Sequence, residues 1–317
     1  MMKKKIDWVN YSKAIGIILV VFGHVWRGIN AKGLLTNNFA FLLIDDLVYS
    51  FHMPLFFLIS GFFVSNSFSK YNNKDLVNKK AKTLMYTYFV WSTVQILVNI
   101  ILSNYTNNST DFWAILKLVY LPISPFWYLY SLFLMYLLYV FTSSINIKLN
   151  LFLSIILYLV PNTGISLVEN LFNFYIYFVL GSLFFNFIVQ YNERVQTLFF
   201  SIPLFFLSFF IYKYILKVDD IRFYFIPAII GSIIVFNLSK VLSNNKILNL
   251  LGNNSLIIFL LHIFFTAGTR IFLFNILGVS SVTLHLFLGL IIGLIGPIIF
   301  NYFYVKLNLK GLFVYPF

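Results

Sequence analysis

Long apolar runs recur along the whole chain, and they limit the possible folds more than any other feature of the sequence. About 20 consecutive apolar residues can cross a bilayer as a helix, because a helix pairs its backbone polar groups within the segment. Ten such runs can be placed, although the fifth is short for a span. We expect spans at about 8–28, 41–64, 83–103, 126–142, 149–160, 171–189, 197–215, 223–239, 255–276 and 283–305.

Composition leads to the same class of protein. Hydrophobic residues make up 61% of the chain, charged residues 10%, and the mean hydropathy is +0.90. A soluble domain of 317 residues could not bury that much apolar surface. We therefore expect an all-α, polytopic membrane helix bundle of about ten transmembrane helices, formed by one domain over residues 1–317. The first apolar run is too long for a cleavable signal peptide.

The positions of the lysines predict the orientation in the membrane. Positive residues favour cytoplasmic loops, and two basic clusters are separated by two expected spans. Both termini are therefore expected in the cytoplasm. The clusters are Lys3, Lys4 and Lys5 before the first span, and Lys70, Lys74, Lys79, Lys80 and Lys82 after the second. A later group on the expected outer side, which includes Lys213, Lys217 and Arg222, departs from this rule.

Charge and cysteine content exclude several classes of function. The formal net charge is +13, but the positive residues lie in short loops between spans, so we do not expect nucleic-acid binding. The chain has no cysteine, which excludes disulfides and thiolate chemistry. The four histidines show no metal-type spacing such as His-Glu-x-x-His, so no metal site is expected.

The first expected span carries ionisable residues on one face. His24 follows Lys13 by eleven positions, about three helical turns, and Arg27 continues the same face. Ionisable side chains within a span are costly, so they usually face a protein interior and mark a function. We therefore expect His24 to be the central residue of a site.

Asp45 and Asp46 lie near the expected outer end of the second span, at a depth similar to that of His24. A carboxylate bonded to one ring nitrogen would fix the tautomer of His24 and raise the basicity of the other nitrogen. Alternatively, the two aspartates only occupy the first turn of a helix, where negative charge suits the helix dipole.

His52 shares a face with Asp45, seven residues earlier, and Pro54 should loosen the backbone hydrogen bonding beside it. Two histidines in adjacent spans, each with a charged residue on its face, favour function. The alternative is that His52 only bonds a neighbouring helix.

Two further groups have a structural and a functional interpretation. Lys79, Lys80 and Lys82 either set the topology or also hold phosphate groups at the cytoplasmic surface. Trp127 and Tyr128 either belong to an aromatic belt at the membrane interface or line a pocket.

The ninth expected span also contains ionisable residues. His262 lies in mid-span, and Arg270, deeper than the other late charges, needs a partner, for which Glu169 is one candidate. His285, near the start of the tenth span, is expected at the interface. We count Arg27, Trp127, Tyr128, His262 and Arg270 as candidate substrate-binding residues.

Four motifs together resemble the integral-membrane acyltransferase type 3 family. They are Asp7-Trp8 followed by Lys13 and, after ten intervening residues, His24 in VVFGHV; the string FHMPLFFLISGFFV at 51–64; Lys79-Lys80-Ala81-Lys82 before the third span; and Asn254-Ser255 leading to His262. The likeness covers nearly the whole chain. Lysines stand where arginines are common in the family, which weakens any bidentate contact to phosphate.

The resemblance implies about ten transmembrane helices and O-acylation of a carbohydrate. The donor would be cytoplasmic acetyl-coenzyme A, with no tightly bound cofactor, and Lys13, Lys79, Lys80 and Lys82 would bind it. The acceptor would be a surface glycan, a lipid-linked sugar or a peptidoglycan-type polymer. The protein would be a multi-pass protein of a bacterial plasma membrane, with the bilayer, the acyl donor and the carbohydrate as its partners.

These residues lead to a mechanistic hypothesis in which His24 is the general base and Asp45 or Asp46 orients it. His52, Lys13 or a backbone group at Ser60-Gly61 would stabilise the oxyanion. Two other classes remain open. One is a transporter or flippase for acyl groups or polyprenyl-linked sugars, whose internal repeats and broken helices are not evident here. The other is a structural partner within an export complex.

Overall fold

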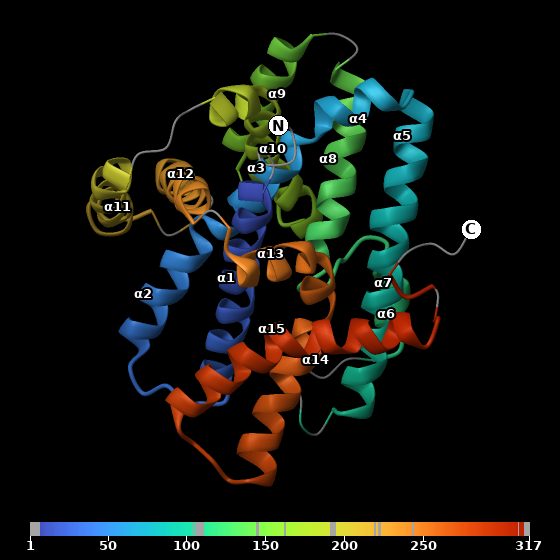
Figure 1. Cartoon of the computed structure of the whole chain (residues 1–317), viewed down its shortest axis with the longest axis vertical. Coiled ribbons are helices and arrows are strands. Elements are labelled where there is room, and N and C mark those ends of the chain that lie inside the picture. The colour runs from blue at the N-terminus through green and yellow to red at the C-terminus, as the bar shows by residue number, and fades with distance from the viewer. Residues whose placement is uncertain are drawn as a thin grey trace. The chain divides into compact units, whose positions relative to one another are not determined.

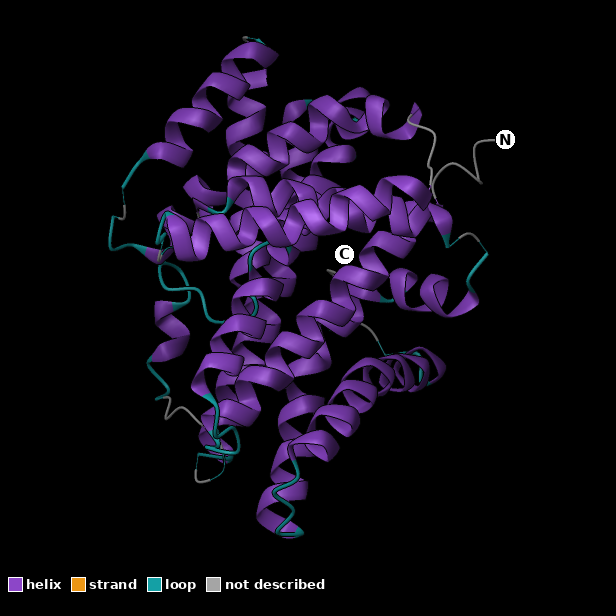
Figure 2. Cartoon of the chain, turned by 90° about the vertical axis from the view of Figure 1, so that its left-hand side faces the viewer, coloured by secondary structure: helices purple, strands orange, loops and turns teal. Residues whose placement is uncertain are grey.

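The structure is a computed structural model that describes residues 7–103, 105, 111–143, 146–161, 163–190, 195–218, 220, 223–242, 244–309 and 311–313. The described residues form helices joined by loops, without a strand among them (Figures 1 and 2). The all-α prediction is therefore confirmed for these residues. Lys3, Lys4, Lys5 and Arg222, used above for the topology, lie outside them.

The helices follow one another along the chain with few long connections. They are α1 (Asp7–Ala31), α2 (Asn38–Tyr49), α3 (His52–Phe62), α4 (Val64–Lys70), α5 (Asn73–Lys80), the π-helical η2 (Ala81–Met85), α6 (Tyr86–Ile101), α7 (Ala114–Lys117), α8 (Trp127–Ser143), α9 (Ile147–Leu159), α10 (Ser166–Gln190), α11 (Val195–Phe210), η3 (Ile211–Ile215), α12 (Phe225–Val241), α13 (Lys246–Asn253), α14 (Ser255–Ile271), η5 (Phe272–Ile276) and α15 (Val282–Lys306).

Within the described residues, seven helical segments are long and apolar enough to cross a membrane. They are Asp7–Ala31, Asn38–Phe62, Asn73–Ile101, Ser166–Gln190, Val195–Ile215, Ser255–Ile276 and Val282–Lys306. Three shorter apolar helices, Trp127–Thr142, Ile147–Leu159 and Phe225–Val241, occupy the remaining expected spans at 126–142, 149–160 and 223–239. An all-helical fold with candidate membrane spans is thus confirmed for the described residues, while the number of ten spanning helices and the cytoplasmic termini stay predictions.

Asparagine side chains set the start of several helices. Asn37 accepts a hydrogen bond from the backbone N–H of Ala40 at 3.0 Å and so caps α2. Asn245 accepts from the N–H groups of Ile247 and Leu248, both at 3.0 Å, at the start of α13. A helix leaves its first N–H groups unpaired, so such caps end the loops at defined residues.

The second expected span contains a break. α2 ends at Tyr49 and α3 begins at His52, which places Pro54 in the first turn of the new helix. Proline has no N–H to donate to the preceding turn, but it is tolerated where those donors are unpaired anyway. The break therefore lies just before Pro54, between Tyr49 and His52.

The described helices form two compact units. Unit 1 comprises Met1–Phe56 and Phe187–Tyr304, and unit 2 comprises Phe57–Asn186 and Val305–Phe317. The single domain expected over residues 1–317 stays a prediction.

In unit 1, α2 runs antiparallel to α1 and approaches it closely. Glycines permit this approach. A Cβ at Gly23 would lie 2.9 Å from the ring of Tyr49, and one at Gly16 would lie 3.0 Å from the ring of Phe56. Larger residues at these two positions would push the rings away, so the sequence of α1 brings the end of α2 and the start of α3 onto its surface.

α14 runs parallel to α1 in the same unit. Near the start of both helices the Asn10 amide donates to the side chain of Asn253 at 2.9 Å, and near their ends the guanidinium of Arg270 lies directly against Gly28. α15 crosses α1, with Gly289 against the side chain of Val25 (Figure 1). Helix α1 is therefore the centre of unit 1, and residues from α2, α14 and α15 surround its second half.

In unit 2, α3 and α10 cross with their backbones in contact. A Cβ at Gly61 would meet the carbonyl oxygen of Phe178, and a Cβ at Gly181 would meet the carbonyl oxygen of Leu58. Such small residues are typical of helix pairs in membranes, where close packing replaces the hydrophobic drive available in water.

We predict that Gly61→Ala lowers the unfolding temperature of the purified protein, because the new methyl group would collide with backbone that cannot move independently. Overpacking of this kind costs about 1–3 kcal/mol. Thermal unfolding in detergent measures the change. Gly268→Ala is the matched control, since a Cβ there has nothing within 4 Å and alanine is the better helix former. An equal loss of stability in both variants would contradict the packing described here.

Candidate functional site

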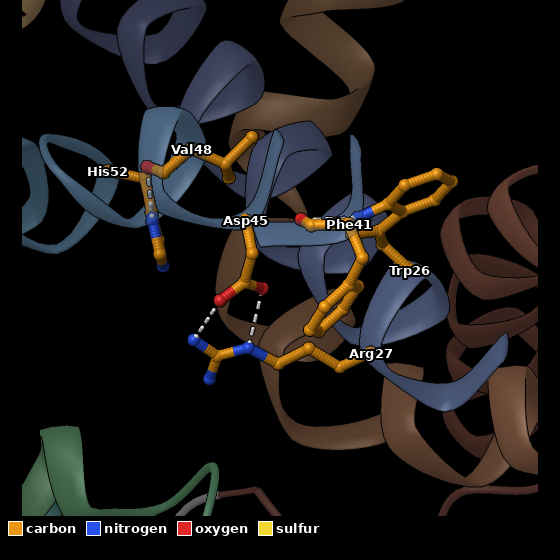
Figure 3. Close-up of polar contacts among 6 residues, drawn as sticks. All are labelled: Trp26, Arg27, Phe41, Asp45, Val48 and His52. Carbon is orange, nitrogen blue, oxygen red and sulfur yellow. Dashed lines mark hydrogen bonds and ion pairs between the residues drawn. The ribbon is translucent and has the colours of Figure 1, made fainter. Parts of the chain in front are cut away.

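An ion pair between α1 and α2 lies at the centre of the candidate site in unit 1. Nε and Nη2 of Arg27 donate to the two carboxylate oxygens of Asp45, each at 2.7 Å (Figure 3). The Asp45 side chain is 11% exposed and that of Arg27 46%. Bidentate pairs of this kind fix the relative geometry of both side chains as well as contributing energy. The ion pair therefore holds the two helices in one register.

The second aspartate also has a cationic partner. Asp46 accepts a hydrogen bond from Nζ of Lys213, in η3, and forms an ion pair with it. Lys213 belonged to the outer group that departed from the positive-inside rule. In the structure this lysine is therefore part of an ion pair within unit 1.

The expected pair between His24 and an aspartate is corrected by the structure. Both carboxylates are bound to cations, and no described hydrogen bond joins either one to His24. A carboxylate in a poorly solvated place gains more from a permanent cation than from a neutral imidazole, and Arg27 is within reach. The alternative, that the aspartates serve the helix dipole, also fails, since α2 has no acidic residue in its first turn.

Tyr49 connects the ion pair to the second histidine. The guanidinium carbon of Arg27 lies 3.3 Å from the centre of the Tyr49 ring, a cation–π contact. The ring of His52 meets the same tyrosine edge-on, with 4.5 Å between centroids and an interplanar angle of 85°. Sequence reasoning did not single out Tyr49, although its place three residues before His52 in YSFH was an available signal.

His52 is buried at the start of α3. Its Nδ1 lies 2.8 Å from the carbonyl oxygen of Val48, in the last turn of α2 (Figure 3). A carbonyl oxygen can only accept, so Nδ1 carries the proton and Nε2 is the nitrogen left for chemistry. The helix break before Pro54 thus orients an imidazole ring, which fits a functional role and also the alternative of simple helix-to-helix bonding.

His24 and His262 lie side by side. Their ring centroids are 4.9 Å apart and their planes are inclined at 57°. His24 is half-buried, and no hydrogen bond from the described residues reaches its ring. Sequence reasoning proposed both residues for the site, but it did not predict that they would be neighbours.

His262 has a defined tautomer. Its Nδ1 lies 2.8 Å from the carbonyl oxygen of Phe259 and 3.1 Å from that of Ile258, so Nδ1 donates. Its Nε2 is buried and has no partner among the described residues. A buried nitrogen without a hydrogen-bond partner costs free energy. The ring of His24 lies beside this imidazole.

Arg270 lies on α14, two turns beyond His262. Its guanidinium lies against Gly28, and its Nε has no hydrogen-bond partner among the described residues. Glu169, named above as one candidate partner, belongs to unit 2 and accepts a hydrogen bond from the backbone N–H of Gly164 at 2.9 Å.

Lys13 and His285 are two other residues of unit 1 that the sequence analysis named. Neither is adjacent in sequence to His24, His262 or Arg270. Lys13 lies half-buried on α1, three turns before His24. His285 is buried, and its Nε2 lies 2.8 Å from the carbonyl oxygen of Val279 in the preceding loop. Within the described part of the chain, no group of three or more histidine, aspartate or glutamate side chains could hold a metal ion.

The candidate phosphate-binding lysines lie in unit 2, and two of them contact aromatic rings. Lys79 donates to the hydroxyl of Tyr71, and this hydrogen bond lowers the pKa of Tyr71. Nζ of Lys80 lies 4.0 Å from the centre of the Tyr136 ring, while Lys82 is exposed on η2. Lys79 and Lys82 are therefore the more accessible of the three.

Trp127 and Tyr128 pack against other rings within unit 2. Phe57 has its ring centroid 6.3 Å from that of Trp127 and 4.9 Å from that of Tyr128. The hydroxyl of Tyr128 is 3.0 Å from Oγ of Ser60. These contacts describe a packed aromatic cluster at the start of α8, and the choice between belt and pocket stays a prediction.

The comparisons with known proteins identify the family of the chain. A family model described as an acyltransferase domain matches residues 6–302. The chain belongs to the acyltransferase type 3 family. The family match includes all of α1, α2 and α14, which supply the histidines and the ion pair of the candidate site.

Two relatives of this family member match part of the chain. Nodulation protein NolL of Sinorhizobium fredii (strain NBRC 101917 / NGR234) is 29% identical over 182 residues, which are 55% of this chain and 47% of the relative. Nodulation protein NolL of Mesorhizobium japonicum (strain LMG 29417 / CECT 9101 / MAFF 303099) is 26% identical over 129 residues, 41% of this chain and 34% of the relative. Each match thus covers less than half of the relative's length. No solved structure gives a significant match.

For this acyltransferase family member we predict that Asp45→Asn destabilises the fold by about 1–3 kcal/mol, because it leaves the Arg27 guanidinium without its charged partner. Arg27→Gln added to Asp45→Asn should cost much less than Arg27→Gln alone, as expected of residues that interact directly. Chemical or thermal unfolding in detergent provides all four stabilities of the cycle. Asp7→Asn, in the exposed first turn of α1, is the control. Additive effects of the two substitutions would contradict the ion pair.

Proposed function

We propose that this protein is a membrane-embedded O-acyltransferase that moves an acetyl or related acyl group from cytoplasmic acyl-coenzyme A to a hydroxyl of a cell-surface polysaccharide or lipid-linked sugar. Its family supports acyl transfer. The observation that carries the proposal is the pair of adjacent imidazoles, His24 and His262, each of which lies in a segment long and apolar enough to span a membrane. An accessible imidazole without a protein hydrogen bond is available to take a proton from a substrate.

In the proposed reaction His24 is the general base. Its ring takes the proton of the acceptor hydroxyl while the hydroxyl oxygen attacks the thioester carbonyl carbon. The carbon–sulfur bond then breaks, and the coenzyme thiolate leaves with the proton that His24 received. A thioester is already activated, so no covalent intermediate on the protein is needed, and the chain has no cysteine to form a thioester.

His262 is proposed to stabilise the protonated form of His24. Nδ1 of His262 donates to backbone carbonyls, so Nε2 carries the lone pair when the ring is neutral. A lone pair next to the His24 ring can accept a hydrogen bond when His24 becomes charged. This role replaces the one first expected of Asp45 and Asp46, which are engaged by Arg27 and Lys213.

The ion pair of Arg27 and Asp45 is proposed to position the site. It presents the guanidinium against the Tyr49 ring, and Tyr49 in turn contacts both Gly23 of α1 and the ring of His52. Moving any of these groups would displace the backbone next to His24, and misplacements of about 1 Å can cost about a hundredfold in rate.

The proposal also includes the topology, with about ten transmembrane helices and both termini in the cytoplasm. The cluster that contains Lys79 and Lys82 would then face the cytoplasm and bind the phosphates of the donor. A transporter or flippase is the competing class, and family membership favours the acyltransferase.

We predict that His24→Ala lowers acylation of surface glycans by at least about a hundredfold, because a general base typically contributes a factor of 10²–10⁴. Mass spectrometry of glycans from cells that carry the variant measures this, together with the amount of inserted protein. The control is His285→Gln, which removes a histidine that only bonds a loop carbonyl. Normal acylation in the His24→Ala variant would remove His24 from the catalytic role.

The lysines yield a separate prediction about the donor. Lys79→Ala and Lys82→Ala should each weaken acetyl-coenzyme A binding by roughly tenfold to a hundredfold, because each would remove a charge-assisted contact worth about 1.5–3 kcal/mol. Calorimetry on the purified protein measures the affinity, and the effect should shrink in high salt because exposed charges are screened.

Lys70→Ala is the matched control for the donor, since Lys70 is an exposed lysine of the same region outside the family-like motif. Calorimetry with sealed vesicles, prepared with the protein inserted in either orientation, shows which face binds the donor. Binding of acetyl-coenzyme A should appear only where the cytoplasmic face of the protein is on the outside of the vesicle. Equal and small effects of all three substitutions would leave topology as the role of these lysines.

A further inference from the structure

Arg270 is a cation whose charge no described residue balances. It lies within the segment Ser255–Ile276, which is long and apolar enough to span a membrane. The two ion pairs among the described residues use Arg27 and Lys213, and no hydrogen bond involves the Arg270 guanidinium. Its Nε is shielded from solvent and unpaired, whereas its Nη atoms are not among the buried unpaired groups. The donors that stay accessible are therefore the terminal nitrogens.

Arg27 shows what an arginine does in this environment when an anion is supplied. It binds both oxygens of Asp45 at 2.7 Å and lies on the face of Tyr49. Arg270 has neither kind of partner, although it is the more enclosed of the two at Nε. A charge inside a membrane span is costly unless it meets an anion or water, so such a residue usually marks a ligand.

The site of Arg270 is built rather than accidental. Its guanidinium occupies the space where a side chain at position 28 would lie, so the glycine at Gly28 makes room for it. Helix side chains lean towards the N-terminus, which carries the Arg270 head back along α14 in the direction of His262. The guanidinium is thus held against α1 instead of extending along the outside of α14.

This position is close to the proposed base. Gly28 follows His24 by four residues on α1, about 6 Å along the helix axis. That rise is about the size of one sugar ring. A substrate whose hydroxyl lies at His24 would therefore place another substituent at Arg270. This substituent would be on the same sugar or on the adjoining linkage.

We propose that the acceptor is anionic, and that Arg270 binds a phosphate or carboxylate group that the acceptor carries within about one sugar unit of the acylated hydroxyl. This inference rests on the proposed acyl transfer and specifies its substrate class. The planar guanidinium matches both kinds of oxyanion in a two-point contact, which an ammonium group cannot reproduce. Arg27 and Lys213 are each paired with an aspartate, and an anionic acceptor would supply the negative charge for Arg270.

The test is ligand-induced thermal stabilisation of the purified full chain in a phospholipid-free maltoside detergent. Glucose 1-phosphate and glucuronate are the anionic probes, and methyl glucoside is the neutral probe. At least one anionic probe should stabilise the protein at concentrations where the neutral sugar does not. Arg270→Gln should weaken its binding by about tenfold to a hundredfold. Arg270→Lys keeps the charge and loses the two-point contact, so it should weaken binding of the anionic probe less. This variant keeps the test decisive if Arg270→Gln does not fold.

Lys32→Gln is the matched control, because it removes a positive charge just beyond the end of α1, next to the ring of Phe274, and leaves Arg270 in place. Equal stabilisation by neutral and anionic sugars would overturn the inference. Equal losses of affinity for the anionic sugar in Arg270→Gln and Lys32→Gln would overturn it as well. So would an Arg270-dependent stabilisation by phosphatidylglycerol vesicles alone, which would assign the cation to a lipid headgroup. A loss of acetyl-coenzyme A affinity in place of sugar affinity would assign it to the donor and overturn the inference as well.

The sugar-binding measurement separates this inference from the proposed function because the sugar probes are added without an acyl donor. Arg270-dependent binding of an anionic sugar by a protein that transfers no acyl group would contradict only the proposed function. Acyl transfer by a protein that binds neutral and anionic sugars equally would contradict only the inference.

Discussion

The ion pair between Arg27 and Asp45 is the interaction on which the candidate site depends. It joins the second half of α1 to α2 by two short hydrogen bonds. Through it the guanidinium is held on the ring of Tyr49, and Tyr49 links the pair to His52. A charged pair in a membrane span is favourable only when both groups are well matched, and once matched it specifies one register of the two helices.

This pairing also explains why His24 remains available. Had a carboxylate bound the imidazole, the ring would have been held as part of an ionic network. Instead Arg27 and Lys213 bind the carboxylates, and the neighbour of His24 is the ring of His262. His262 and Arg270 lie beside the stretch of α1 that carries His24, and Nε2 of His262 and Nε of Arg270 have no hydrogen-bond partner within the described residues. In the account proposed above, the substrate supplies both a hydroxyl and an anion to this site.

The sequence was sufficient for the helices, because hydropathy and the cost of unpaired backbone in lipid leave little choice of fold. It also identified His24, His52, His262 and Arg270 as unusual, since an ionisable residue in an apolar run is visible without a structure. It could not assign the partners. Spacing gives the depth and the face of a residue, but the choice of Asp45 between His24 and Arg27 depends on which cation reaches it in three dimensions. Tyr49 was missed because a tyrosine in an aromatic-rich chain carries no distinctive signal.

The central claim is that this protein cleaves a thioester through His24, and release of the coenzyme thiol tests it most directly. The chain has no cysteine, so any thiol that appears in a proteoliposome assay comes from the donor. We predict that vesicles with the purified wild-type chain release free thiol from acetyl-coenzyme A when a carbohydrate acceptor is present, and that vesicles with correctly inserted His24→Ala release it at the rate of protein-free vesicles. Wild-type vesicles without thiol release, or equal release by the variant, would contradict the account.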